Sequence, residues 1–92
     1  MRESAIELYL CSQVRKHGGI AYKFTSPGRR SVPDRIVLWP CGEMQFVECK
    51  APGEKPTPLQ QREHDKLRAM KFMVNVVDSF ELVDTLIEFR PR

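Results

Sequence analysis

Two acidic residues and a lysine stand close together in residues 32–50, VPDRIVLWPCGEMQFVECK. They are Asp34, Glu48 and Lys50, and the residues between them are mostly apolar. Two carboxylates beside a lysine suit two different settings, which are a solvated face of a sheet and a site that holds a divalent metal ion. The rest of the chain has to distinguish between these two interpretations.

The same stretch is typical of a β-hairpin, with strands over residues 34–39 and 43–50 and a loop over residues 40–42. The loop ends in a glycine, which supplies the positive φ that commonly closes a three-residue hairpin loop. In this register Asp34 lies directly opposite Glu48, at a Cβ separation of roughly 4.5–5.5 Å. Both acids then share one face of the sheet with large apolar side chains, because successive residues of a strand point to alternate faces.

Opposed carboxylates on a partly apolar face repel each other, and a protein can respond in three ways. The pKa of one acid can rise, a cationic neighbour such as Lys50 can neutralise one charge, or a metal ion can bind both acids. Mg²⁺ is commonly held by one or two carboxylates together with water molecules and substrate phosphate oxygens. The hairpin therefore predicts either an ion pair or a magnesium-type site at Asp34 and Glu48.

The elements around the hairpin follow from the spacing of apolar residues and from Pro- and Gly-rich loops. The expected helices cover residues 3–16, 59–70 and 79–89, and the expected strands cover residues 20–24, 34–39, 43–50 and 72–77. This order predicts an α/β fold in which helices pack on a mixed sheet. A length of 92 residues suits a single domain over residues 1–92.

Polar residues also fall on the inward sides of the first two expected helices. At 100° per residue, Glu3 and Glu7 lie within the apolar arc of residues 3–16. An acid near a helix N-terminus is favourable in itself, which is the simpler explanation for Glu7 and an equally good one for Glu3. Gln60 lies toward the inward side of the second helix, but the sequence TPLQ also matches a capping box that begins at Thr57. The spacing alone favours the capping role for Gln60.

The composition is that of a globular protein with a slightly basic surface. The chain is 41% hydrophobic and 29% charged, with a net charge of +3, which permits a polyanionic partner without requiring one. Its three cysteines show no CxxC spacing, so the sequence indicates neither a disulfide framework nor a zinc ribbon. There is no signal-peptide core and no apolar run of membrane-spanning length. We expect a soluble protein of the cytoplasm, without membrane association and without a nucleotide cofactor.

Four motifs follow one another in a fixed order along the chain. They are an acid on the first helix, Pro-Asp before a strand, Glu-Cys-Lys at the end of the next strand, and Gln on the following helix. This ordered set resembles the pattern of the PD-(D/E)XK nucleases. The sequence is most similar to the stand-alone form of the virus-type replication-repair nuclease (VRR-NUC) family. The segments that carry the resemblance are GGIAYKFTSPGRRSVPDRIVL, FVECKAPGEKPTPLQQREHDKL and VNVVDS, which together extend over most of residues 3–83.

The resemblance implies a restriction-endonuclease-like αβββαβ core with a Mg²⁺ or Mn²⁺ site. Asp34 and Glu48 would be metal ligands together with the main-chain carbonyl of Cys49, and Lys50 would complete the catalytic motif. Glu3 and Gln60 match the family's N-terminal acid and helix glutamine, so both would lie beside the metal. For these two residues the resemblance now outweighs the explanations based on helix ends.

Basic residues flank the predicted site on both sides. Loops with such residues are usually only solvated, but beside a phosphodiesterase site arginine suits phosphate contact. The residues expected to contact DNA are Lys23, Ser26, Arg29, Arg30, Arg35 and Lys55.

The expected activity is metal-dependent, structure-specific DNA endonuclease cleavage, by a homodimer that resolves four-way (Holliday) junctions in a bacterial or phage-infected cell. The alternatives are a monomeric nuclease that processes flaps or ends, a nucleic-acid-binding module without catalysis, and a structural domain whose acids pair with Lys50 and Arg35. Candidate residues for a dimer interface are Phe72, Val74, Phe80, Leu82, Leu86 and Phe89, although ordinary core packing explains most of them singly.

Overall fold

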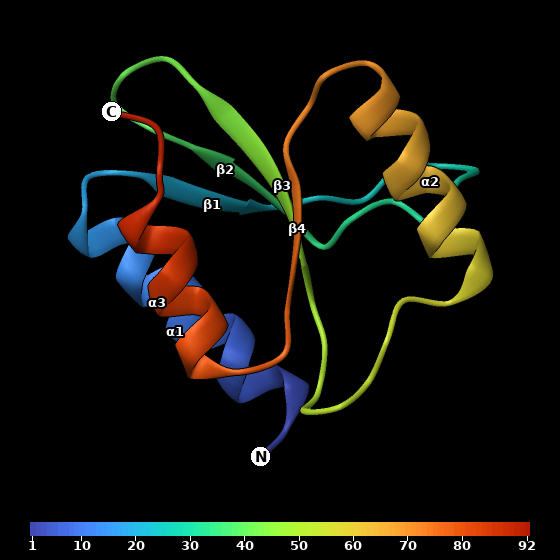
Figure 1. The fold of residues 1–92 in the computed structure, drawn as a ribbon, viewed down its shortest axis with the longest axis horizontal. Coiled ribbons are helices and arrows are strands. Elements are labelled where there is room, and N and C mark those ends of the chain that lie inside the picture. Colours follow the sequence, from blue (N-terminus) through green and yellow to red (C-terminus); the bar gives the residue numbers. More distant parts are fainter.

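The computed structural model describes residues 1–92 and contains one four-stranded sheet with three helices. The helices are α1 (Glu3–Lys16), α2 (Pro58–Ala69) and α3 (Phe80–Glu88), and the strands are β1 (Ile20–Lys23), β2 (Arg35–Leu38), β3 (Met44–Cys49) and β4 (Val74–Val77). The predicted order of elements and the α/β fold class are confirmed (Figure 1).

The sheet is mixed, with strand order β1-β2-β3-β4. The first three strands are antiparallel neighbours, whereas β4 runs parallel to β3. A parallel pair needs a crossover connection, and the segment containing α2 supplies it. The central strand β3 therefore has a neighbour on each side, and five of its six residues are buried.

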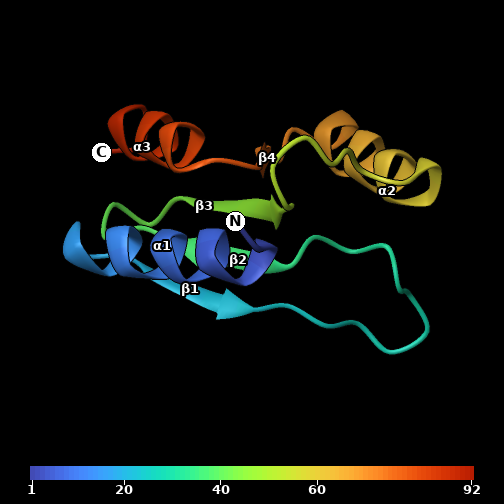
Figure 2. The ribbon, with the colours of Figure 1, turned by 90° about the horizontal axis from the view of Figure 1, so that it is seen from below.

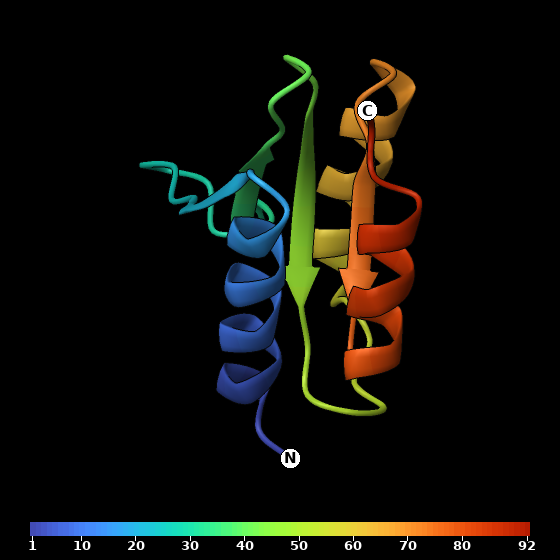
Figure 3. The ribbon, with the colours of Figure 1, turned by 90° about the vertical axis from the view of Figure 1, so that its left-hand side faces the viewer.

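The helices cover the two faces of the sheet unequally. Helices α1 and α3 lie side by side on one face, and α2 lies alone on the other, as Figures 2 and 3 show. The hydrophobic core lies between the sheet and helices α1 and α3. Its residues are Ile6, Leu10, Val14, Val37, Trp39, Val47, Cys49, Val77, Val83, Leu86 and Ile87.

The structure differs from the sequence prediction mainly at the ends of elements. The strand predicted over residues 72–77 begins only at Val74. Lys71 adopts a positive φ of 73°, and the Phe72 N–H donates to the Leu67 carbonyl. Residues 71 and 72 therefore belong to the C-terminal turn that ends α2. Helix α3 begins after Ser79, whose Oγ accepts from the Leu82 N–H.

None of the three helices combines the length and apolar character needed to span a lipid bilayer.

Candidate active site

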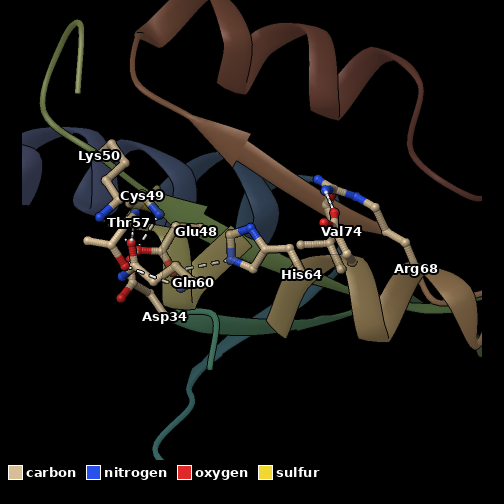
Figure 4. A network of polar contacts seen from close by, with 10 residues as sticks. Asp34, Glu48, Cys49, Lys50, Thr57, Gln60, His64, Arg68 and Val74 are labelled. Atoms are coloured by element: carbon tan, nitrogen blue, oxygen red, sulfur yellow. Dashed lines mark hydrogen bonds and ion pairs between the residues drawn. The ribbon is translucent and has the colours of Figure 1, made fainter. Parts of the chain in front are cut away.

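The hairpin has the register that brings the two acids together. Ile36 pairs with Phe46, and the Trp39 N–H donates to the Glu43 carbonyl at 2.9 Å. Continuing this register by two residues sets Asp34, directly before β2, opposite Glu48 near the end of β3. Figure 4 shows the two carboxylates beside Lys50 and Gln60. This meeting point lies on the sheet face that α2 covers.

Glu48 is almost completely enclosed, since its side chain is 3% exposed. Its Oε2 accepts a hydrogen bond from Gln60 Nε2 at 3.3 Å and lies 3.6 Å from Lys50 Nζ. Burial, and next the charge of Asp34, raise the pKa of Glu48 to about 7, and Lys50 offsets only part of the rise. The site therefore holds more negative charge than its own lysine neutralises.

Asp34 is held by the main chain of the opposite strand, because its Oδ2 accepts from the Cys49 N–H at 2.9 Å. Every second pair in an antiparallel ladder exchanges hydrogen bonds, and the Trp39–Glu43 pair is one of these. Counting from it, Cys49 would pair with Pro33, which has no N–H to donate. The carbonyl of Cys49 thus receives no ladder hydrogen bond from this strand, as a main-chain ligand requires.

The side chain of Cys49 points to the other face of the sheet, where it belongs to the hydrophobic core. Burial raises the pKa of its thiol, with Asp34 the next cause, so the sulfur is neither a nucleophile nor a ligand at this site. Only the main chain of Cys49 faces Asp34.

Gln60 both caps α2 and contacts Glu48, the two alternatives considered for it from the sequence. It caps α2, because its Oε1 accepts from the Thr57 N–H at 2.9 Å while its own N–H donates to Thr57 Oγ1 at 3.2 Å. The opposite end of the same amide donates to Glu48. An amide has a donor and an acceptor at different atoms, so the cap fixes the side chain in the orientation that reaches the acid.

Lys50 and Glu3 approach the acids from different elements. The Lys50 side chain is 11% exposed. The main-chain N–H of Lys50 donates to the Val77 carbonyl, which fixes the backbone at this residue beside β4. Glu3 opens α1 and is exposed at the rim of the site. Partial burial, and next the Asp34 carboxylate, raise the pKa of Glu3, so the two acids interact electrostatically.

Four of the six residues expected to contact DNA are engaged within the protein. Glu7 accepts from Lys23 at 3.2 Å and forms an ion pair with Arg35 at 3.0 Å, a role that the helix-end explanation for Glu7 did not foresee. Ser26 forms an isolated bridge with Arg29. The remaining two, Arg30 and Lys55, are exposed and form no ion pair.

Two open hollows flank the loop between β1 and β2. One, of about 380 Å³, extends from Lys23 to Asp34. The other, of about 370 Å³, reaches Thr57 and Gln60. Arg30 lines both hollows, so an exposed cation is common to a depression that reaches Asp34 and one that reaches Gln60, the hydrogen-bond partner of Glu48.

Two residues beside this cluster had no assigned role in the sequence. Glu63 of α2 is buried and pairs with Arg29 at 2.9 Å, which ties the β1–β2 loop to α2. His64 is completely buried with Nε2 3.9 Å from Glu48 Oε1, and burial, followed by the charge of Arg68, lowers its pKa. Helical spacing could have identified His64 from the sequence, since position 64 lies one helical turn beyond Gln60.

The donor set fits a hard divalent cation. Nowhere do three or more His, Cys, Asp or Glu side chains approach closely enough to hold a metal ion. Asp34 and Glu48 nevertheless offer two carboxylates, and the Cys49 carbonyl adds a third oxygen donor. Mg²⁺ and Mn²⁺ accept such oxygen donors and fill their other positions with water or substrate oxygens.

Comparison with known proteins identifies the family of this chain. A scan against protein-family models finds no match. The chain is 62% identical over 86 residues to "Putative nuclease p44" of Acyrthosiphon pisum secondary endosymbiont phage 1, covering 94% of this chain and 92% of the relative. A solved structure described as "VRR_NUC domain" superposes with a TM-score of 0.90 at 38% identity and covers 97% of both chains. The chain therefore belongs to the VRR-NUC family of nucleases.

Proposed function

We propose that this protein is a Mg²⁺- or Mn²⁺-dependent, structure-specific DNA endonuclease that hydrolyses phosphodiester bonds. The observation that carries the proposal is the pairing of the enclosed Glu48 carboxylate with Asp34, with only Lys50 to balance them. Such a pair destabilises a folded protein unless a cation completes it. This favours a catalytic site over the structural alternative, in which Lys50 and Arg35 would both pair with the acids, because Arg35 pairs with Glu7 and leaves Lys50 alone beside Glu48.

Asp34, Glu48 and the Cys49 carbonyl would hold the metal ion. When bound, the ion would activate a water molecule and neutralise charge on the phosphate. Lys50 supplies positive charge on the same side of the sheet, where it would orient the attacking water or stabilise the pentavalent phosphorus. Gln60 orients Glu48 through its 3.3 Å hydrogen bond, and Glu3 lies at the rim, next to Asp34.

DNA would reach the site along the two hollows beside the β1–β2 loop. Arg30 and Lys55 are free to contact phosphates, whereas Arg29 is engaged with Glu63 and would hold the loop in place. Contacts of this kind read the backbone and the shape of DNA and not its sequence. Structured or branched DNA is therefore the proposed partner.

The test is cleavage of labelled linear, flapped and four-way DNA by the purified chain with Mg²⁺, Mn²⁺ or chelator. We expect cutting that depends on the metal ion and is lost in Asp34→Ala and Glu48→Ala, which keep DNA binding. If folded protein cuts none of these substrates, the enzyme proposal fails. Salt-dependent DNA binding without cleavage would instead support a binding module.

The finer proposal is a homodimeric resolvase of four-way junctions. Such a junction is resolved by cuts at two symmetry-related strands, and two copies related by a two-fold axis would supply both cuts. An exposed apolar surface suits a second copy, since β4 and α3 line a groove of about 230 Å³ whose rim includes Leu82, 43% exposed, and Phe89, 77% exposed.

The other interface candidates divide into buried and exposed residues. Val74 and Leu86 are buried within the fold, at 7% and 6% exposure, and Phe80 stacks on Tyr9 with ring centroids 4.3 Å apart, so core packing explains these three. Phe72 is 41% exposed and joins the candidates that remain available.

Light scattering on the free protein, with cuts mapped on both strands of a fixed junction, tests the dimer. Phe89→Asp should produce monomers and abolish paired cutting, whereas Leu8→Asp changes a similarly exposed side chain on α1, at 72% exposure, and should do neither. A wild-type monomer at micromolar concentration that trims flaps and ignores junctions would refute the resolvase and select the monomeric nuclease.

We place the activity in the cytoplasm of a bacterial or phage-infected cell, supported by the phage origin of the relative.

A further inference from the structure

The unpartnered polar atoms of this protein are concentrated at one place. Three buried side-chain nitrogen or oxygen atoms have no hydrogen-bond partner, namely Oε1 of Glu48 and both ring nitrogens of His64. A buried polar group without a hydrogen-bond partner lowers stability, because it has lost its contacts with water. An apolar side chain at position 64 would avoid two of these costs, so stability alone does not explain a histidine there.

The geometry relates the histidine to the acid. Gln60 and His64 are four residues apart on α2, so both side chains extend toward β3 from the same side of the helix. Gln60 Nε2 reaches Oε2 of Glu48 at 3.3 Å, and His64 Nε2 faces Oε1 at 3.9 Å. Figure 4 shows the two side chains approaching the carboxylate from successive turns of α2.

The gap of 3.9 Å is longer than a hydrogen bond and too short for a bridging water. A water molecule between them would need about 2.8 Å to each partner, which holds the two partners further apart. The His64 ring has no exposed surface, so water does not reach it from outside either. A small rotation of the Glu48 carboxylate would bring the two atoms into direct contact.

We propose that His64 is a positioning residue for Glu48, whose Nε2–H donates to Oε1 when the carboxylate takes its metal-holding orientation. Gln60 and His64 then fix one oxygen each, so the plane of the carboxylate is set before substrate arrives. This leaves a lone pair of Oε2 directed to the side of Asp34 and the Cys49 main chain. The inference rests on the proposed metal-dependent function and adds to it a role for His64.

The experiment compares His64→Leu, which removes the donor, with His64→Gln, whose side-chain amide can still donate. Mn²⁺ binding to the full chain without DNA is measured by the electron paramagnetic resonance signal of free Mn²⁺, and cleavage gives kcat and KM separately. We expect His64→Leu to melt at or above the wild-type temperature in chelator, yet to lose about 10–100-fold in Mn²⁺ affinity or kcat. KM for DNA should stay unchanged, and His64→Gln should recover most of the loss.

Two results would overturn the inference. One is a leucine variant that binds Mn²⁺ and cleaves like the wild type, which would make His64 a packing residue. The other is a glutamine variant as impaired as the leucine variant, which would remove the role of the donated hydrogen bond. If His64→Leu does not fold, His64→Met takes its place with the same expectations. Failure of the wild type itself to bind Mn²⁺ or to cleave would instead refute the proposed function, so the two failures are distinguishable.

Discussion

Replacing Glu48 by glutamine should stabilise the metal-free protein at pH 8. The Glu48 side chain is 3% exposed, and burial together with Asp34 raises its pKa from an ordinary 4.5 to about 7. Glutamine removes the charge and keeps a carbonyl oxygen for the hydrogen bond from Gln60. The substitution therefore isolates the cost of holding this charge without a metal ion.

The size of the effect follows from the pKa shift. A rise from 4.5 to about 7 corresponds to about 3 kcal/mol, at about 1.4 kcal/mol per pH unit. Because the folded protein retains the Glu48 proton to higher pH than the unfolded chain, the free energy of unfolding falls as pH rises from 4.5 to about 7. Below this window both states are protonated and the cost vanishes. The pKa of about 7 already includes the Lys50 contact at 3.6 Å, but glutamine places a new amide NH2 group beside that lysine, so the gain should stay below the full value.

The assay is urea and thermal unfolding of wild type and Glu48→Gln in chelator at pH 4.5, 6 and 8. A gain of about 2 kcal/mol at pH 8 would raise Tm by roughly 10 °C in a domain of this size, and the difference should disappear at pH 4.5. Glu54→Gln removes an exposed acid from the β3–α2 loop and serves as the matched control.

The result that would refute this reasoning is a loss of stability in Glu48→Gln at pH 8. It would mean that the ion pair with Lys50 outweighs the burial of the charge and the repulsion from Asp34, and that the acids have a structural role. Adding Mn²⁺ supplies the complementary measurement. The wild type should gain stability with the metal ion, and the variant should gain much less.

Four further substitutions test the site. Thr57→Ala and Gln60→Ala should each cost about 1 kcal/mol by removing one half of the cap of α2, measured by urea unfolding. In cleavage assays Gln60→Ala alone should lose activity, and an equal loss in Thr57→Ala would assign Gln60 to the cap only. Lys50→Ala should abolish cleavage while DNA affinity, measured by fluorescence anisotropy, stays within a few-fold; a large loss of affinity would make Lys50 a binding residue. Arg30→Ala should weaken DNA binding and lower the salt slope by about 1, unlike exposed Arg15→Ala at the far end of α1, and equal effects would point to non-specific charge.

The sequence predicted the acid pair because hairpin register is a local property. The loop over residues 40–42 contains a proline and a glycine, and Gly42 has a φ of 87° in the structure. Once the loop length is set, every pair along the two strands follows by counting, including Asp34 opposite Glu48. The same locality explains why the cap at Thr57 was predictable.

Contacts between distant segments could not be predicted in this way. Arg35 was expected to contact DNA or the acids, and it pairs with Glu7, 28 residues away. Arg29 pairs with Glu63 of α2, 34 residues away. These partners depend on how α1 packs against β1 and on the path of the β1–β2 loop, and no local spacing encodes either. The free Cys49 carbonyl, by contrast, follows from Pro33 once the register is known.

The two faces of the sheet differ in a way that explains why an unfavourable pair of acids is tolerated. The face under α1 and α3 carries the core of apolar side chains, so most of the hydrophobic stabilisation lies there. Helix α2 covers the other face, and its two buried residues are Glu63 and His64. Because stability comes mainly from the first face, the second can hold a charged carboxylate and unpartnered nitrogens without unfolding the protein. It follows that substitutions of Glu48 should abolish the chemistry without unfolding the protein, whereas truncating Val47, the neighbour that points into the core, should lower the free energy of unfolding.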